Sequence, residues 1–320
     1  MPDILILGQI TVDHAVPAEP GPWRASVGGN ALYAAAGARL WCDPARIGVV
    51  ARLGHGLPGD VAGLLEAAGL TPAGLRRVDT EPLVEWLLYE PDGSRRTLPR
   101  NPSLRDPHAD AETLRGRYLA QLEAVSAAAD DVPAGWLPAV AVHLAPQVRA
   151  RHEASVARLR GLAGFLSVDP SPHYARGRDE RALAEMLGGI SAFLPSRVEV
   201  EHLASGGDWT ALAFRLGAAG FGEIVIKLGG EGCLLYRAGE GGPVRVPAAP
   251  AAVVDLTGAG DAFCGAYAAC RALGRSPADA ARRAAVAAAM VVECAGAPAA
   301  LALSPAEAHR RLPRLAAGTR

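Results

Sequence analysis

The strongest constraint on the fold is a repeated alternation of short apolar runs with longer segments of helical periodicity. The runs with strand character are Ile4–Gly8, Arg46–Ala51, Val140–Leu144, Phe165–Val168, Ser191–Leu194 and Ile224–Leu228. The helical segments between them are Gly29–Leu40, Gly59–Ala68, Ala111–Val125, Gln147–Leu162, Asp179–Leu187, Val198–Leu203 and Trp209–Ala219. Apolar strands that alternate with helices are typical of a parallel sheet covered on both faces. The sequence therefore predicts an α/β sandwich of three layers.

Two parts of the chain depart from this rhythm. After Gly229 the pattern predicts short strands joined by glycine-rich turns, followed by helices, and these are Cys233–Arg237, Pro243–Val246, Ala252–Asp255, Gly260–Leu273, Pro277–Cys294 and Pro305–Leu315. Residues 10–27 and 83–99 also break the alternation, and the turn residues 91–94 make the second stretch a hairpin. We expect one α/β domain over residues 1–320, with a small β-sheet lid built from 10–27 and 83–99.

Composition narrows the possible partners and the compartment. Lys and Arg number 32 against 33 Asp and Glu, so the net charge of -1 gives no attraction toward nucleic acid or an anionic membrane. The longest apolar run, Ala284–Val292, is far shorter than the roughly 20 residues of a membrane-spanning helix. The start of the chain lacks the basic and apolar regions of a signal peptide. The five cysteines form no C-x-x-C pair, so we expect reduced thiols in the cytoplasm.

Phosphate binding would need an unusual arrangement in this chain. Lys227 is the only lysine, so a phosphate must be held by backbone N–H groups, arginine, a metal ion or that single side chain. The first strand ends Gly8–Thr11 without the G-x-G-x-x-G pattern of dinucleotide-binding folds. The phosphate loop of Walker-type NTPases is excluded as well, because Lys227 precedes Leu228 and Gly229 at a strand end.

The segment Asp255–Phe263 (DLTGAGDAF) is the best candidate for chemistry. Gly258, Ala259 and Gly260 present consecutive N–H groups at the start of a helix, where the positive end of the helix dipole favours an oxyanion. Asp261 follows in the first turn, and a carboxylate beside an anion site suits a base for an attacking hydroxyl. Taken alone, the same residues also fit a glycine-rich turn with an aspartate that caps its helix.

Several motifs in order along the chain resemble the ribokinase-like (PfkB) family of carbohydrate kinases. They are Gly8–His14 (GQITVDH), Ser26–Ala31 (SVGGNA), Ser196–Glu199 (SRVE), Lys227–Gly232 (KLGGEG) and Asp255–Phe263. The last of these is the most specific, and together the motifs extend over most of the chain. The resemblance implies the ribokinase-like three-layer α/β/α fold with a mostly parallel sheet and a β-sheet lid. It also implies ATP and Mg²⁺ as cofactors.

The resemblance further implies roles for individual residues. Asp261 would be the catalytic base, and the amides of Gly258, Ala259 and Gly260 would form the anion hole. The residues implied to bind substrate are Asp13, Gly28, Gly29, Asn30 and Tyr33. Those implied to border the nucleotide are Ser196, Lys227, Gly229 and Gly232. Glu199 would lie near Mg²⁺ through water, and Asp255 with Thr257 would belong to a loop that binds a monovalent cation such as K⁺ in many members.

Two departures from the family pattern affect the functional hypothesis. Ser196 replaces the usual Asn, and Tyr33 stands where many sugar kinases have a substrate-binding Asn. The leading hypothesis is an ATP- and Mg²⁺-dependent kinase that phosphorylates an alcohol of a small polyol: a sugar, a cyclitol or a nucleoside. An aromatic slot around Tyr33 would favour a nucleoside. The alternative is a ribokinase-like sugar sensor or assembly protein with weakened catalysis. The exposed edges of a β flap also offer a surface for dimerisation through the lid.

Overall fold

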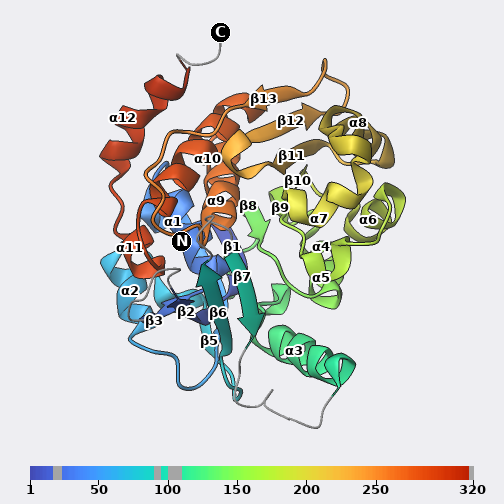
Figure 1. Cartoon of the computed structure of the whole chain (residues 1–320). Helices are drawn as coiled ribbons and strands as arrows, with labels where there is room; N and C mark the ends of the chain where they lie inside the picture. Colours follow the sequence, from blue (N-terminus) through green and yellow to red (C-terminus); the bar gives the residue numbers. More distant parts are fainter. Residues whose placement is uncertain (17–23, 90–94, 100–109, 317–320) are drawn as a thin grey trace.

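A nine-stranded sheet runs through the centre of the molecule (Figure 1). The computed structural model describes residues 1–16, 24–89, 95–99 and 110–316. In spatial order the strands are β13 (Val244–Val246), β12 (Cys233–Arg237), β11 (Glu223–Lys227), β10 (Ala192–Phe193), β9 (Ala163–Val168), β8 (Ala139–Leu144), β1 (Ile4–Gln9), β4 (Ile47–Leu53) and β5 (Leu75–Arg77). All neighbouring pairs are parallel except β11–β12 and β12–β13, which are antiparallel. The mostly parallel sheet predicted from the sequence is therefore confirmed.

Side chains that alternate along each strand divide the core between two faces of the sheet. In β1, Ile4 and Ile6 join one apolar cluster, whereas Leu5 and Leu7 join the other. The helices over the first face are α1 (Asn30–Arg39), α2 (Val61–Ala67), α9 (Ala259–Ala272), α10 (Pro277–Val292), α11 (Ala297–Leu301) and α12 (Pro305–Ala316). Those over the second are α4 (Arg149–Leu159), α5 (Pro172–Ala175), α6 (Glu180–Leu187), α7 (Arg197–Val200) and α8 (Trp209–Ala219). Helices on both faces give the three-layer α/β/α sandwich.

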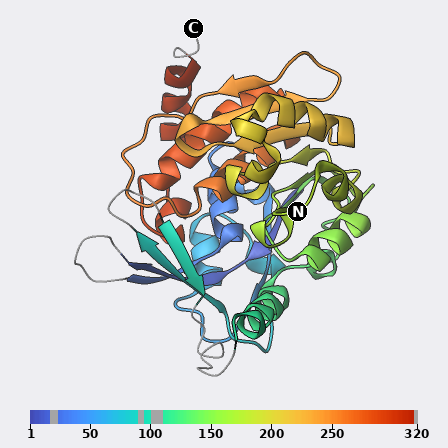
Figure 2. The same cartoon turned by 45° about the vertical axis from the view of Figure 1, so that its right-hand side comes forward.

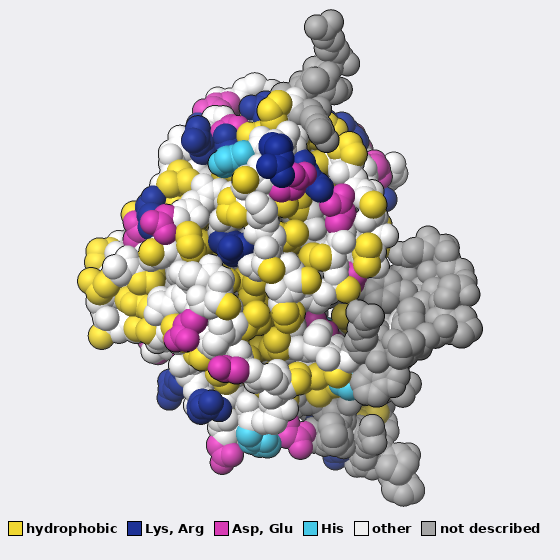
Figure 3. Space-filling view, turned by 90° about the vertical axis from the view of Figure 1, so that its left-hand side faces the viewer, with side chains coloured by type: hydrophobic (Ala, Val, Ile, Leu, Met, Phe, Trp, Pro, Cys, Tyr) yellow, Lys and Arg dark blue, Asp and Glu magenta, His cyan; other side chains and the backbone are white. Residues whose placement is uncertain are grey.

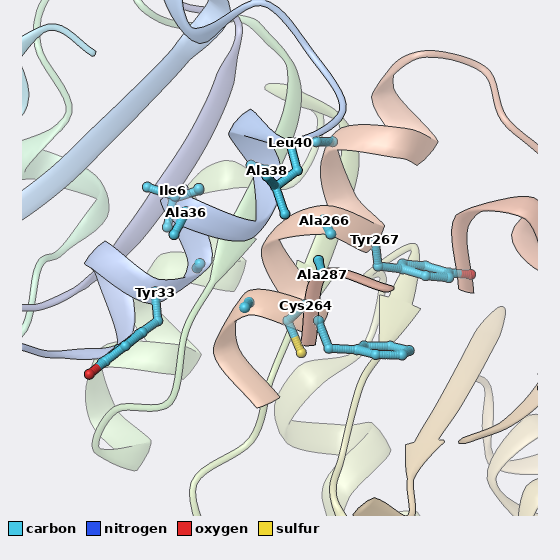
Figure 4. Close-up of a cluster of buried hydrophobic side chains, with 14 of the residues drawn as sticks. Ile6, Tyr33, Ala36, Ala38, Leu40, Cys264, Ala266, Tyr267 and Ala287 are labelled. Carbon is cyan, nitrogen blue, oxygen red and sulfur yellow. The ribbon is translucent and has the colours of Figure 1, made fainter. Parts of the chain in front are cut away.

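Helices α1 and α9 lie in close contact on the first face. A Cβ at Gly37 would meet the carbonyl oxygen of Ala262 at 2.0 Å, and one at Gly265 would meet that of Ala34 at 1.9 Å. Only glycine permits this approach. Small side chains such as Ala38 and Ala266 fill the contact around it (Figure 4). The first half of α9 is thereby held against the middle and second half of α1.

A second sheet of four strands stands apart from the sandwich (Figure 2). Its order is β3 (Arg24–Gly28), β2 (Thr11–Val16), β6 (Leu83–Tyr89) and β7 (Arg95–Pro99). Both stretches that break the βα rhythm contribute to it, although residues 17–23 and 90–94 lie outside the described residues. Strands β2 and β6 are parallel, and Asp13 pairs with Glu85 in the register. Helix α3 (Ala111–Val125) packs its Leu122 and Val125 near Leu83 of this sheet.

The expected strand Ala252–Asp255 is wrong. The N–H groups of Val254 and Asp255 both donate to the carbonyl oxygen of Val292, at 2.7 and 3.1 Å, so the segment bonds to the end of α10 and to no strand. Its apolar residues are not buried in the sheet, since Val253 and Val254 are exposed. The sequence also missed three short elements, β5, α5 and α11. All three are too short to show a period of their own.

The outer surface agrees with the balanced composition. On the face shown in Figure 3, Arg side chains are interspersed with Asp and Glu. On α12, for example, Arg311 bonds Glu307 and Glu293, each at 2.8 Å. Among the described residues, none of the helices has both the length and the apolar character needed to cross a membrane.

Candidate active site

The segment that begins α9 has a backbone conformation that only glycine adopts easily. Gly258 is the N-cap of the helix with φ +78°, and a Cβ there would lie 2.1 Å from Cγ of Tyr33. Just before it, the buried Asp255 accepts a 2.7 Å hydrogen bond from the N–H of Thr257, which tightens the turn. Asp261 then lies in the first turn of α9. N–H groups at the start of a helix have no partner within the helix, so this turn can bind an anion.

Two cavities meet at this segment. The larger, of about 860 Å³, is lined by Thr257, Gly258 and Asp261 on this side. The smaller, of about 440 Å³, is lined by the next residues of the same turn, Ala259 and Gly260. The start of α9 is therefore the boundary between two cavities, and one turn of backbone can contact molecules in both.

One wall of the larger cavity is polar and comes from the four-stranded sheet. Asp13 and Glu85, neighbours on β2 and β6, both line it. Asp13 is buried and accepts a 2.6 Å hydrogen bond from the hydroxyl of Thr11. Gly28 on β3 makes room for this carboxylate, since a Cβ there would overlap Asp13 Oδ2 at 1.8 Å.

The floor of the larger cavity is a network around the end of β1. Asn30 Oδ1 accepts from the N–H of Gln9 at 2.8 Å, and its Nδ2 donates to Gln9 Oε1 at 3.1 Å and to the carbonyl of Pro146 at 2.8 Å. Gly29 has φ +106°, and a Cβ there would lie 2.4 Å from the carbonyl oxygen of Gln9. Both amide hydrogens of Asn30 are thus used within the protein, and Oδ1 keeps one lone pair for a hydroxyl donor.

A further wall comes from α3 and α5 and was not indicated by the sequence. Tyr118 donates its hydroxyl to Glu85 Oε1 at 3.0 Å, which links α3 to the four-stranded sheet. Its ring centroid lies 5.3 Å from that of His173, and Arg115 and Arg176 line the cavity beside them. Burial, followed by repulsion from these two arginines, lowers the pKa of His173. No motif marks these residues, because they become neighbours only through the packing of α3 on α5.

The smaller cavity is mostly apolar. Its lining residues, besides the start of α9 and Lys227, are Gly229, Gly230, Gly232, Ala248, Ala249, Pro250, Ala251, Val253, Leu256, Phe263, Ala285, Ala288, Ala289 and Val292. Gly229 and Gly232 have φ +62° and +85°, and a Cβ at Gly232 would lie 2.0 Å from the carbonyl oxygen of Val246. The glycines keep the backbone of this loop open at the mouth of a site suited to a flat apolar group.

Lys227 forms a buried polar cluster where the cavities meet. Its Nζ lies 2.5 Å from Asp169 Oδ2 and 3.2 Å from Cys264 Sγ. Burial opposes the charge on the ammonium, but attraction from Asp169 and other negative neighbours outweighs it and raises the pKa of Lys227. Burial, together with the nearby carboxylates of Glu199 and Asp261, raises the pKa of Asp169 to about 7 even though Lys227 opposes this shift. One fixed cation thus lies among three carboxylates.

Ser196 and Glu199 sit beside this cluster. Glu199 is buried, and its Oε2 accepts hydrogen bonds from the N–H of Ser196, at 2.6 Å, and from the Ser196 hydroxyl. Ser196 also forms a parallel bridge with Lys227 across the sheet. Among the described residues, the side chains form no cluster of three or more acidic, His or Cys groups able to hold a metal. A Mg²⁺ ion typically uses one or two carboxylates with phosphate and water, and Glu199 with Asp261 fits that donor set.

Comparison with known proteins identifies the family. The description "pfkB family carbohydrate kinase" matches residues 9–302, nearly the whole chain. The chain belongs to this family. All the motifs quoted above lie within the matched range except Gly8, the residue just before it. The resemblance seen in the sequence is confirmed.

Relatives of this pfkB-family chain include sugar and nucleoside kinases. An uncharacterized sugar kinase of Archaeoglobus fulgidus is 40% identical over 101 residues, 31% of this chain and 38% of that protein. The 2-dehydro-3-deoxygluconokinase of Escherichia coli is 44% identical over 82 residues, 25% of this chain and 26% of that protein. The cytidine kinase of Thermococcus kodakarensis is 24% identical over 278 residues, 86% and 90% of the two chains. The matches to the first two thus span well under half of those proteins.

Solved structures of the ribokinase type share the fold of this pfkB-family member. The nucleoside kinase of Burkholderia thailandensis, in complex with inosine, superposes with a TM-score of 0.74 at 19% identity over 98% of each chain. The ribokinase of Arabidopsis thaliana, in complex with ribose and ATP, gives 0.66 at 21% identity over 97% and 98%. The expected ribokinase-like α/β/α fold is therefore confirmed.

Most residues selected from the sequence of this pfkB-family chain lie around the two cavities. Tyr33 lines the larger cavity but is otherwise buried against Gly258, so its ring is part of the wall. Glu199, which taken alone resembles a solvated helix residue, is buried. His143 is also buried, and its Nδ1 lies 3.0 Å from the hydroxyl oxygen of Ser167.

Proposed function

We propose that this chain transfers the γ-phosphoryl group of ATP to an alcohol of a small polyol. The observation that carries the proposal is the position of one helical turn at the boundary of two cavities, with Asp261 toward one and Gly260 toward the other. A kinase must bring two substrates together across a short distance, and phosphoryl transfer depends mainly on positioning and charge neutralisation.

In this proposal ATP lies in the smaller cavity and the polyol in the larger. The apolar lining from α10 and residues 248–256 suits the base, and the loop with Gly229 and Gly232 would border the ribose and phosphates. The N–H groups of Gly258, Ala259 and Gly260 would hold the transferred group as charge develops on it. Mg²⁺ would neutralise the phosphates, held through water by Glu199, whose carboxylate Ser196 orients.

Asp261 would act as the general base for the polyol. Its carboxylate takes the proton of the attacking hydroxyl as the new O–P bond forms and the bond to the ADP oxygen breaks. Asp13, Gly28, Gly29 and Asn30 would bind the other hydroxyls on the polar side of the cavity. The loop of Asp255 and Thr257 is the proposed place for a monovalent cation such as K⁺. Residues 10–27 and 83–99 would form a lid that excludes water.

The wall of Tyr118 and His173 favours an acceptor with a planar part, such as a nucleoside. A cavity of about 860 Å³ is larger than a single sugar ring requires, and two aromatic rings with Arg115 and Arg176 line part of it. The cytidine kinase that matches 86% of the chain points in the same direction. The alternative, a sugar sensor with weakened catalysis, would bind the polyol without consuming ATP.

An ADP-release screen with ATP and Mg²⁺ across nucleosides, sugars, sugar acids and cyclitols tests the proposal. The matched control is Asp261→Asn, which keeps the shape of the side chain and removes the base. We expect turnover with at least one acceptor that the variant lacks, with nucleosides the most active class. Turnover that survives in Asp261→Asn would show that Asp261 is not the base. Silence across the panel, with a polyol still raising the melting temperature, would favour the sensor.

A further inference from the structure

The proposed base and anion hole do not account for the buried cluster of Lys227, Asp169 and Cys264. The three side chains contact one another in a closed triangle, with Cys264 Sγ 3.3 Å from Asp169 Oδ2 completing the two contacts of Lys227 Nζ. Asp169 comes directly after β9, and Lys227 ends β11. The triangle therefore joins two strand ends to helix α9 at the edge of the sheet where both cavities open.

The same cluster touches the start of α9. Gly260 and Cys264 are four residues apart and share one face of the helix. The open side of Gly260, where a Cβ would stand, is 3.7 Å from Lys227 Nζ and 3.9 Å from its Cε. The ammonium thus lies beside Gly260, whose N–H group is proposed for the anion hole, and Lys227 lines the smaller cavity.

We propose that Asp169 is a positioning residue for phosphoryl transfer, because it fixes the Lys227 ammonium beside Gly260 at the boundary of the two cavities. Two of the three ammonium hydrogens are directed to Asp169 and Cys264, so one remains for an oxygen in the cavity. A cation held at one place stabilises developing negative charge without having to reorganise. The inference rests on the proposed kinase activity.

A purely structural role is the competing explanation, and energetics argue against it. Two charges lose hydration when they are buried, and apolar residues of similar volume often stabilise a protein as well or better. The chain contains a single lysine among its 320 residues, and it lies in this cluster at the cavity boundary. A position chosen for stability alone would not require the only ammonium of the protein.

The first experiment compares Asp169→Asn with a matched control, Glu223→Gln. Glu223 is a buried carboxylate at the other end of β11, and it pairs with Arg271 at the other end of α9. Steady-state kinetics with the best acceptor of the screen should show kcat reduced roughly 10- to 100-fold in Asp169→Asn, since small misplacements near the reacting groups have effects of that size. The KM for ATP should change less than kcat, and Glu223→Gln should keep the wild-type kcat.

A second pair of variants separates positioning from folding. Replacing both charges together, as Lys227→Met with Asp169→Leu, should leave a folded protein with a melting temperature near that of the wild type and little turnover. In Lys227→Ala, added alkylammonium ions should restore part of the kcat by occupying the vacated space. The same ions should restore much less when Asp169→Asn is present as well, because nothing then orients them.

Each outcome decides the matter. Reduced kcat in Asp169→Asn, together with amine rescue that depends on Asp169, supports the positioning role. Wild-type kcat in Asp169→Asn, full turnover in the double apolar variant, or equal rescue with and without Asp169 overturns it while the kinase activity stands. A wild-type protein that phosphorylates none of the acceptors overturns the proposed function itself, and this inference with it.

Discussion

Strand β11 has a buried ion pair at each end, both in contact with helix α9, and the two pairs differ in construction. At the cavity end, Lys227 meets Asp169 through a single nitrogen and shares it with Cys264. At the far end, Arg271 meets Glu223 through two nitrogens, at 2.7 and 3.1 Å, and the hydroxyl of Tyr267 adds a third bond at 2.8 Å.

The difference shows what each pair is suited for. A forked guanidinium bound on both sides of a carboxylate is fixed and satisfied, which suits a joint between helix and sheet. An ammonium bonded to one carboxylate and one weakly accepting thiol keeps donor capacity, which suits a group that faces a ligand. The same two elements therefore carry a stabilising end and a reactive end.

The contrast between a reactive and a stabilising end of α9 is tested most strongly at Asp261, where we expect the largest effect. Asp261→Ala should lower kcat roughly 10²- to 10⁴-fold, the usual effect of removing a general base, because the acceptor hydroxyl then keeps its proton. Substrate affinity measured by calorimetry should change little, as should the melting temperature. Near-normal kcat in Asp261→Ala would contradict the reactive role assigned to this end of α9.

Gly258→Ala should have the next largest effect. The new Cβ would lie within about 2 Å of the Tyr33 ring, and φ +78° is strained for any L side chain, so the turn and the ring must both shift. We expect turnover to fall roughly 100-fold, since the anion-binding N–H groups move with the turn. The matched control is Gly274→Ala, because Gly274 after α9 also has a positive φ but has no atom within 4 Å of an added Cβ. If backbone strain alone lowered turnover, the two variants would have the same kcat.

The two ends also differ in how much of their structure could be predicted from the sequence. Features set by local residues could be predicted, whereas contacts between distant segments could not. The helix Trp209–Ala219 was found at its exact limits, because apolar spacing and an aspartate cap are local signals. The DLTGAGDAF segment likewise reports a local backbone requirement at Gly258. By contrast, Asp169 and Lys227 are 58 residues apart, and Tyr118 meets His173 across two helices. Such pairs depend on strand order and helix packing, which no single segment encodes.

Glu223→Gln tests the stabilising end. Removing one partner of a buried pair leaves Arg271 uncompensated, so the free energy of unfolding should fall by about 3 kcal/mol. Turnover of the folded protein should be unchanged, because neither Glu223 nor Arg271 lines either of the two cavities at the start of α9. Urea denaturation and kinetics on the same sample measure both effects. If kcat fell in Glu223→Gln as much as in Asp169→Asn, the two ends of α9 would not differ in function.

Acid should destabilise the cavity end through two buried histidines beside it. Burial lowers the pKa of His152 to about 4, and burial together with repulsion from Lys227 lowers that of His143 to about 3. His152 bonds the hydroxyl of Tyr174 at 2.6 Å and the carbonyl of Ala145 at 2.9 Å, so both nitrogens of the buried ring have partners when it is neutral. In the unfolded chain both histidines take up protons near pH 6.5.

The unfolded state therefore binds more protons as the pH falls below 6.5, and the stability that these residues provide at neutral pH is lost toward pH 4. At pH 5 each histidine should lower the free energy of unfolding by about 2 kcal/mol relative to pH 7. Urea denaturation at both pH values should show a smaller loss in His152→Gln than in the wild type. Glu223→Gln should keep the full loss, because the proton uptake belongs to the cavity end. An equal loss in all three proteins would mean that the acid response arises elsewhere.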